Sequence, residues 1–133
     1  MATLVDSNVL LDVLTEDAEW YAWSARALEL QANRTVLAIN PIIYSEVSVG
    51  FQRIEELDAA LPPKSIHRLA LPWEAGFLAG KCFLAYRARG GARRSPLPDF
   101  YIGAHASVAG MTLLTRDATR YRTYFPALEL VAP

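Results

Sequence analysis

The feature that most constrains the fold is an alternation of short apolar runs with stretches of helical periodicity. Short, largely apolar runs lie at residues 4–5, 36–39 and 111–114, as is typical of strands buried on both faces. The first run leads into Asp6 and then into Ser7-Asn8, which we expect to cap the following helix. Strands that alternate with helices imply right-handed crossovers. The sequence therefore predicts an α/β fold with a mainly parallel sheet.

The intervals between these runs have the periodicity of amphipathic helices. Helices are predicted over residues 8–14, 18–31, 41–50, 52–60, 73–89 and 98–109, and weaker strands over 66–69 and 128–131. We expect buried faces that include Tyr21, Ser24 and Leu28 in the second helix, and Ile54 and Val108 in later ones. The chain has 133 residues, with no internal repeat or linker, so a single domain, residues 1–133, is predicted.

Four carboxylates are placed so that this fold can gather them at one edge. Asp6 ends the first strand, and Glu46 lies one to two turns into the helix after the second. Asp99 is in the first turn of a helix that precedes a buried strand, and Asp117 follows that strand. The carboxyl ends of parallel strands are where α/β proteins bind ligands. Singly, each acid is better explained as a cap, a turn residue or a solvated side chain, so the prediction depends on their conjunction.

The predicted chemistry of such a cluster is that of a hard divalent cation. No lysine lies in these segments, so we expect the acids to lack a basic partner and to repel one another at neutral pH. Mg²⁺ prefers oxygen ligands and takes one or two carboxylates directly. It can activate water and stabilise a leaving oxygen, as phosphodiester hydrolysis requires. Asn8 and Thr115 flank two of the acids and are candidates to orient carboxylates or metal-bound water.

Charge and composition exclude little but point to one further region. The net charge is −1, so the whole molecule has no strong attraction to nucleic acid. Arginines cluster before Asp99, at Arg87, Arg89, Arg93 and Arg94. These are candidates to contact RNA phosphates, and an arginine-rich solvated loop is the alternative.

No membrane or disulfide signal is present. No apolar run approaches the ~18 residues of a membrane span, and no basic segment precedes Asp6 as in a secretory signal. The one cysteine, Cys82, cannot form an internal disulfide and is expected to be buried, so we expect a cytoplasmic protein without membrane contact. Two histidines, His67 and His105, are expected to be structural. Two tryptophans, Trp20 and Trp23, are expected to pack rather than to stack on bases.

Five segments carry a family resemblance. They are residues 4–11, 43–47, 97–106, 113–117 and 120–126, and each of the first four contains one of the acids. In this order they resemble the PIN-domain family, and more narrowly the VapC-type toxins of bacterial toxin–antitoxin pairs. The resemblance implies a PIN-like three-layer α/β/α fold with a five-stranded sheet, and an endoribonuclease dependent on Mg²⁺ or Mn²⁺. It also implies a homodimer and a small cognate antitoxin that occludes the site.

The resemblance implies that Asp6, Glu46, Asp99 and Asp117 are the catalytic and metal-binding quartet, with Asn8 and Thr115 beside them. The chain departs from the family at one position. Some relatives carry an acid where Arg120 stands, ahead of Tyr121. The fourth ligand therefore depends on Asp117 alone, which acts directly or through water.

Other functions remain as alternatives at this stage. A PIN-like RNA-processing nuclease that is not a toxin and a non-catalytic RNA-binding domain both fit the same fold. A phosphotransferase of the haloacid-dehalogenase kind needs a second acid where this chain has Asn8. A response-regulator receiver domain needs a lysine after a late strand, and none follows Lys81.

Overall fold

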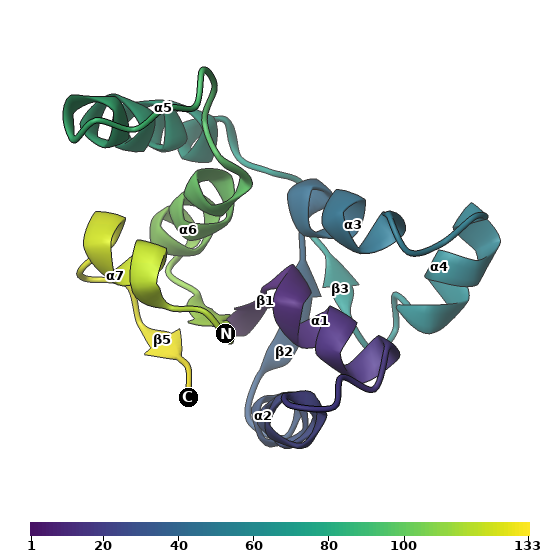
Figure 1. The fold of residues 1–133 in the computed structure, drawn as a ribbon. Coiled ribbons are helices and arrows are strands. Elements are labelled where there is room, and N and C mark those ends of the chain that lie inside the picture. The colour runs from purple at the N-terminus through teal and green to yellow at the C-terminus, as the bar shows by residue number, and fades with distance from the viewer.

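The computed structural model describes all 133 residues, and a five-stranded sheet lies at its centre (Figure 1). Every pairing in the sheet is parallel, and the strand order is β3-β2-β1-β4-β5. The strands are β1 (Ala2–Val5), β2 (Val36–Ile39), β3 (His67–Arg68), β4 (Thr112–Leu114) and β5 (Leu130–Val131). The predicted α/β class and the five-stranded PIN-like architecture are confirmed.

Helices flank the sheet in two groups, which Figure 1 separates to the right and left. One group is α1 (Ser7–Leu14), α2 (Tyr21–Ala32), α3 (Pro41–Ser48) and α4 (Ile54–Ala60). The other is α5 (Trp73–Ala88), α6 (Pro98–Ala109) and α7 (Thr119–Tyr124). Right-handed crossovers require two groups, because the chain moves across the sheet first in one direction and then in the other. None of these helices combines the length and hydropathy that a membrane crossing requires.

The strand order reverses between β1 and β4, and this reversal creates a crevice at their carboxyl ends. Val5 pairs with Leu114, and the amide of Asp6 donates to the carbonyl of Leu114 at 2.8 Å. Asp6 and Thr115 are the next residues along the two strands. Both therefore emerge side by side at the topological switch point of the sheet.

Local capping explains where the helices near this edge begin. Asn40 accepts a hydrogen bond from the amide of Ile43 at 2.9 Å, and Pro41 is in the first turn of α3, as predicted. The cap of α1 differs from the prediction, because Asp6 itself, rather than Ser7 or Asn8, accepts a backbone hydrogen bond, from the amide of Ser7 at 2.8 Å. Asp6 is thus fixed by the strand on one side and by the helix on the other.

Buried polar contacts decide the rotation of α2. Its buried residues are Ser24, Ala27 and Gln31, whereas Tyr21 is exposed. The Ser24 hydroxyl donates to the buried Asp12 carboxylate at 2.7 Å. The predicted face is therefore right at Ser24 and wrong at Tyr21, which is the first residue of the helix and is 40 % exposed.

Two further predicted core positions are exposed. Ile54 begins the short helix α4 and is 62 % exposed, since only Leu57 and the following Leu61 of this segment reach the core. Val108 lies in the last turn of α6 and is 43 % exposed. By contrast, Gly103 of α6 is buried against the ring of Phe125, where an added Cβ would lie 2.4 Å from a ring carbon. The helix can pack this closely only without a side chain.

Helix α7 was not predicted from the sequence. It spans six residues, Thr119–Tyr124, which is too short for a periodic signal. Tyr121 is buried at its centre and Phe125 is buried just after it. This short helix brings further residues to the edge where Asp6 emerges.

Candidate functional site

Asp6 is the buried centre of the site. The residue is 3 % exposed and lies among α1, β4 and α7. Its Oδ2 accepts hydrogen bonds from the hydroxyl of Thr115 at 2.8 Å and from that of Tyr121 at 2.9 Å. Its Oδ1 accepts from the amide of Ser7. One carboxylate oxygen is therefore saturated by hydroxyls, while the other retains a free lone pair.

Asn8 and Thr115, both singled out in the sequence, contact this carboxylate. The Asn8 amide nitrogen donates to Thr115 Oγ1 at 3.3 Å and lies 3.4 Å from Asp6 Oδ2. Its carbonyl oxygen accepts from the amide of Arg116 at 3.0 Å. Asn8 thus ties the start of α1 to the loop after β4 and fixes the orientation of the Thr115 hydroxyl.

Glu46 reaches the same edge from the second turn of α3. Its Oε1 accepts a hydrogen bond from the hydroxyl of Ser7 at 2.9 Å. Because Ser7 follows Asp6 directly, this bond brings the Glu46 carboxylate next to the start of α1. Helix α3 packs against both α1 and α6, and Figure 1 shows α3 above α1 near the middle of the view.

Asp99 completes the group from the first turn of α6. Its Oδ1 lies 3.3 Å from the hydroxyl of Tyr121, the same hydroxyl that contacts Asp6. Its Oδ2 accepts from Arg120 Nη1 at 3.2 Å. We call Asp6, Glu46 and Asp99 the acidic cluster. The expectation that the acids have no basic partner is wrong for Asp99, because the unpredicted helix α7 brings Arg120 to it.

The charge of Asp99 affects the protonation of the other two acids. Burial raises the pKa of Asp6 to about 6, with the charge of Asp99 acting in the same direction and the Thr115 hydrogen bond opposing it. Burial also raises the pKa of Glu46; the Ser7 hydrogen bond opposes this and Asp99 adds to it. Burial and the neighbouring carboxylates raise the pKa of Tyr121 well above its usual value, so its hydroxyl remains a donor.

Asp117 is placed differently from the other three acids. It is exposed, and its carboxylate forms no hydrogen bond or ion pair. Only its backbone contacts the site, through an amide that donates to Thr115 Oγ1 at 3.2 Å. Side-chain hydrogen bonds therefore tie three of the four predicted acids into this edge, whereas Asp117 contacts it only through its backbone.

The donor chemistry of the acidic cluster fits a hydrated hard cation. No three His, Cys, Asp or Glu side chains lie close enough to hold a metal ion together. Mg²⁺ keeps several waters and needs only one or two carboxylates directly. Asp6 and Asp99, linked by one hydroxyl, are the residues that offer this arrangement, and Glu46 is held at the start of α1 by the Ser7 hydroxyl.

Three contact residues were missed in the sequence. Ser7 and Tyr121 hydrogen-bond the acids, and Arg120 forms an ion pair with one of them. The sequence pattern indicates Ser7 only as a helix cap. The spacing of Tyr121 and Phe125 by four residues was the available sign of a helix that buries both.

The predicted arginine cluster divides into two parts. Arg89, at the end of α5, lies over the ring of Tyr124 of α7, 5.3 Å from its centroid. Arg87 instead donates to the carbonyl of Arg93 at 2.8 Å within the loop. Arg93 and Arg94 are exposed. Only Arg89 therefore contacts the element that carries Arg120.

Three other residues have structural contacts. Arg116 donates two hydrogen bonds to the carboxylate of the buried Asp12, at 2.7 and 3.0 Å, and its guanidinium lies over the ring of Trp20. His105 is buried and lies 3.0 Å from the side-chain nitrogen of Asn40. Cys82 is buried as predicted.

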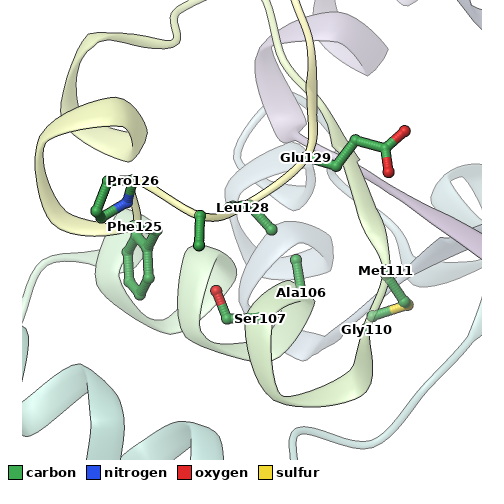
Figure 2. A pocket seen from close by; sticks show the side chains of 9 residues that line it. Ala106, Ser107, Gly110, Met111, Phe125, Pro126, Leu128 and Glu129 are labelled. Carbon is green, nitrogen blue, oxygen red and sulfur yellow. The ribbon is translucent and has the colours of Figure 1, made fainter.

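A surface hollow of about 350 Å³ lies away from the acids, between the last turn of α6 and the segment 125–129 (Figure 2). Figure 2 shows Ala106, Phe125 and Leu128 among the side chains that line it. Asp99 is at the opposite end of α6. The hollow is therefore separate from the acidic cluster.

Comparisons with known proteins agree with this fold. The PIN domain model matches residues 3–126. A VapBC2 structure from Rickettsia felis, bound to a DNA fragment from its promoter, is similar with a TM-score of 0.75 and 20% identity, covering 100% of this chain and 99% of that one. VapBC-1 from nontypeable Haemophilus influenzae has a TM-score of 0.74 and 16% identity, covering 99% and 98%.

A DNA-bound VapBC structure from Salmonella typhimurium has a TM-score of 0.71 and 17% identity, covering 99% of this chain and 98% of that one. No curated protein matches this chain by sequence. At these identities the structural similarity shows only the fold. The family model spans most of the sequence and therefore shows the family. With an all-parallel five-stranded sheet and acids gathered at its switch point, this chain belongs to the PIN domain family.

Proposed function

We propose that this protein is a metal-dependent endoribonuclease that hydrolyses RNA phosphodiester bonds and acts as the toxin of a toxin–antitoxin pair. The observation that carries the proposal is the Tyr121 hydroxyl between two carboxylates, Asp6 and Asp99, that belong to distant parts of the chain. Asp99 already has Arg120 as a partner, but Asp6 is buried with no basic partner, and a carboxylate so placed is costly unless a cation balances it. Membership of the PIN domain family supports a nuclease reaction as the function of that cation.

Mg²⁺ is the proposed cofactor, and Mn²⁺ is an acceptable substitute. Asp6 and Asp99 would hold it, with Glu46 contributing directly or through water. Bound there, the ion would supply an activated water, orient the phosphate and stabilise the leaving oxygen. We propose no direct ligand role for Asp117, whose carboxylate is exposed and acts at most through water.

The residues around the acids define what the protein itself contributes. Thr115, Asn8 and Tyr121 occupy Asp6 Oδ2 and hold that carboxylate in one rotamer. The Ser7 amide fixes Oδ1, and the Ser7 hydroxyl positions Glu46. The site is thus preorganised before substrate arrives, which reduces the reorganisation needed for reaction.

The proposed partners follow from the relatives. The similar structures are described as toxin–antitoxin complexes, which supports a small cognate antitoxin for this chain. We also propose a homodimer. Growth arrest on expression, relieved by Asp6→Asn and by the co-expressed antitoxin, would distinguish a toxin from an RNA-processing nuclease.

Hydrolysis of a panel of cellular RNAs with and without Mg²⁺ tests the central proposal. Wild type should cut only with metal, and Asp6→Asn should lose activity. Asp117→Asn is the matched control, since it removes the same charge from an exposed side chain and should retain most activity. Cleavage in EDTA, or full activity of Asp6→Asn, would reject the mechanism. RNA binding without any cleavage would favour the non-catalytic alternative.

A further inference from the structure

The geometry points to a phosphate-binding role for Arg120, which we propose holds the RNA strand beside the acidic cluster, with Arg89 as the next contact along α7. This inference rests on the proposed function, because it assumes an RNA substrate. It concerns residues that neither the family model nor the similar structures assign. It also gives a function to the position where some relatives carry an acid.

The first observation is how Arg120 is held. Its Nη1 donates to Asp99 Oδ2, while Asp99 Oδ1 faces the Tyr121 hydroxyl and, beyond it, Asp6. Arg120 thus binds Oδ2, on the outer side of Asp99, while Oδ1 faces the other acids. It does not have to leave Asp99 for a cation to bind on the inner side.

The second observation is what remains free on Arg120. A guanidinium carries several N–H donors in a planar fork, and the structure uses one nitrogen, Nη1. The side chain is 44 % exposed. The unused donors are therefore available to solvent at the rim of the cluster, and their geometry suits two phosphate oxygens.

The third observation is that a second arginine continues the same face. Tyr124 follows Arg120 by four residues, so the two side chains share one face of α7. Arg89 lies over the Tyr124 ring. The ring of Phe100, the residue after Asp99, packs on Tyr124 with centroids 5.0 Å apart. Aromatic packing of α5, α6 and α7 therefore fixes Arg89 close to the end of α6 that carries Asp99.

Charge balance explains why the RNA strand needs a positive side chain beside the acidic cluster. Phosphates are repelled by the acidic cluster, and Arg120 is the one lysine or arginine in ion-pair contact with it. A cation at the rim allows a phosphate to approach the carboxylates closely. Arg89 then neutralises a neighbouring phosphate of the same strand.

The test is equilibrium binding of a fluorescein-labelled single-stranded RNA, measured by anisotropy in EDTA over a range of salt concentrations. The protein carries Asp6→Asn so that binding is read apart from cleavage, and gel electrophoresis checks that the RNA stays intact. Arg120→Gln should weaken binding roughly tenfold, as expected when a charge-assisted phosphate interaction is removed. The slope of log Kd against log salt should fall by about 0.7 for each phosphate of the single strand that the variant no longer neutralises.

Two further variants make the result specific. Arg122→Gln removes the same charge from an exposed residue two positions along α7, on another face, and should change Kd and slope little. Arg120→Lys keeps the charge without the fork and should fall between wild type and Arg120→Gln. Arg89→Gln should lower the slope by a similar amount.

A second readout separates phosphate binding from a simple counter-ion role. If Arg120 only neutralises Asp99, Arg120→Gln should strengthen Mn²⁺ binding, measured by calorimetry in protein that retains Asp6, and leave RNA binding unchanged. That outcome, equal effects of Arg120→Gln and Arg122→Gln, or no RNA binding at all would overturn the proposal. Absence of cleavage in the hydrolysis assay with retained, Arg120-dependent binding would instead overturn the nuclease function alone.

Discussion

The raised pKa of Asp6 makes the stability of the metal-free protein depend on pH in a defined direction. Its carboxyl titrates at about 6 in the folded protein against a usual value of 3.8. The folded state therefore holds the Asp6 proton more tightly than the unfolded state does. The contribution of Asp6 to the free energy of unfolding should decrease as pH rises from 3.8 through about 6, and stay constant above.

The size of this effect follows from the two pKa values. Each pKa unit corresponds to about 1.4 kcal/mol, so the full cost of ionising Asp6 in the folded protein is about 3 kcal/mol at neutral pH. At about pH 4.5 the same linkage gives about 1 kcal/mol. Asp6 alone should thus lower the free energy of unfolding by about 2 kcal/mol between about pH 4.5 and pH 7.5.

Urea unfolding of wild type and Asp6→Asn in EDTA, at both pH values, measures this directly. Asn retains the cap to the Ser7 amide but cannot ionise, so the difference between the two proteins isolates Asp6. Other shifted groups, such as Glu46 and Asp58, contribute equally to both and cancel. Asp117→Asn is the control for removing a carboxylate that is exposed.

Relative to wild type, Asp6→Asn should therefore gain about 2 kcal/mol between the lower and the higher pH. Mg²⁺ at one hundred times its Kd should raise the free energy of unfolding of the wild-type protein by about 2.7 kcal/mol. Its affinity should be higher at the higher pH, because the carboxylate must be deprotonated to bind the ion. Parallel pH profiles for wild type and Asp6→Asn would refute the argument that burial perturbs Asp6.

Three other perturbations have defined outcomes. Tyr121→Phe removes the hydroxyl shared by two carboxylates and should cost about 1–3 kcal/mol in urea unfolding and weaken Mn²⁺ binding in calorimetry; unchanged metal affinity would deny the hydroxyl a positioning role. Arg116→Met leaves the buried Asp12 carboxylate without its ion pair and should lower the free energy of unfolding by about 3 kcal/mol. A loss below about 1 kcal/mol, typical of exposed pairs, would contradict this. Gly103→Ala places a Cβ 2.4 Å from the Phe125 ring and should lower stability by about 1–3 kcal/mol, with partial recovery when Phe125→Leu is added; no loss would mean that the ring moves freely.

The fold was largely predictable because its signals are local. The strand at 36–39, buried except at Val36, the Asn40 cap with Pro41 and the helix from Pro98 to Ala109 match the sequence pattern. These features depend on neighbouring residues, whose spacing a sequence displays directly. Predictions failed where contacts between distant residues decide: Asp99 was expected to have no basic partner, and Arg120 reaches it from a helix too short to show periodicity.

The candidate site was predictable in part for the same reason. Asp6, Glu46 and Asp99 were found by their positions relative to strands and helix starts, and the structure brings them together. Asp117 had an equally good position along the chain, yet only its backbone contacts the group and its carboxylate is exposed. A turn residue can orient its side chain either way, and sequence position does not determine which.

The sequence by itself determined the order along the chain of the strands and of every helix but α7, and with it the edge at which Asp6 and Thr115 emerge, because periodicity and capping act over a few residues. Only the tertiary structure decided which groups surround those acids. Helix α7 is too short to have a periodic signal, and it forms because Tyr121 and Phe125 are buried against distant elements. That packing places the Tyr121 hydroxyl between Asp6 and Asp99 and brings Arg120 to the rim, since contacts between residues so distant in the sequence arise only once the sheet has assembled.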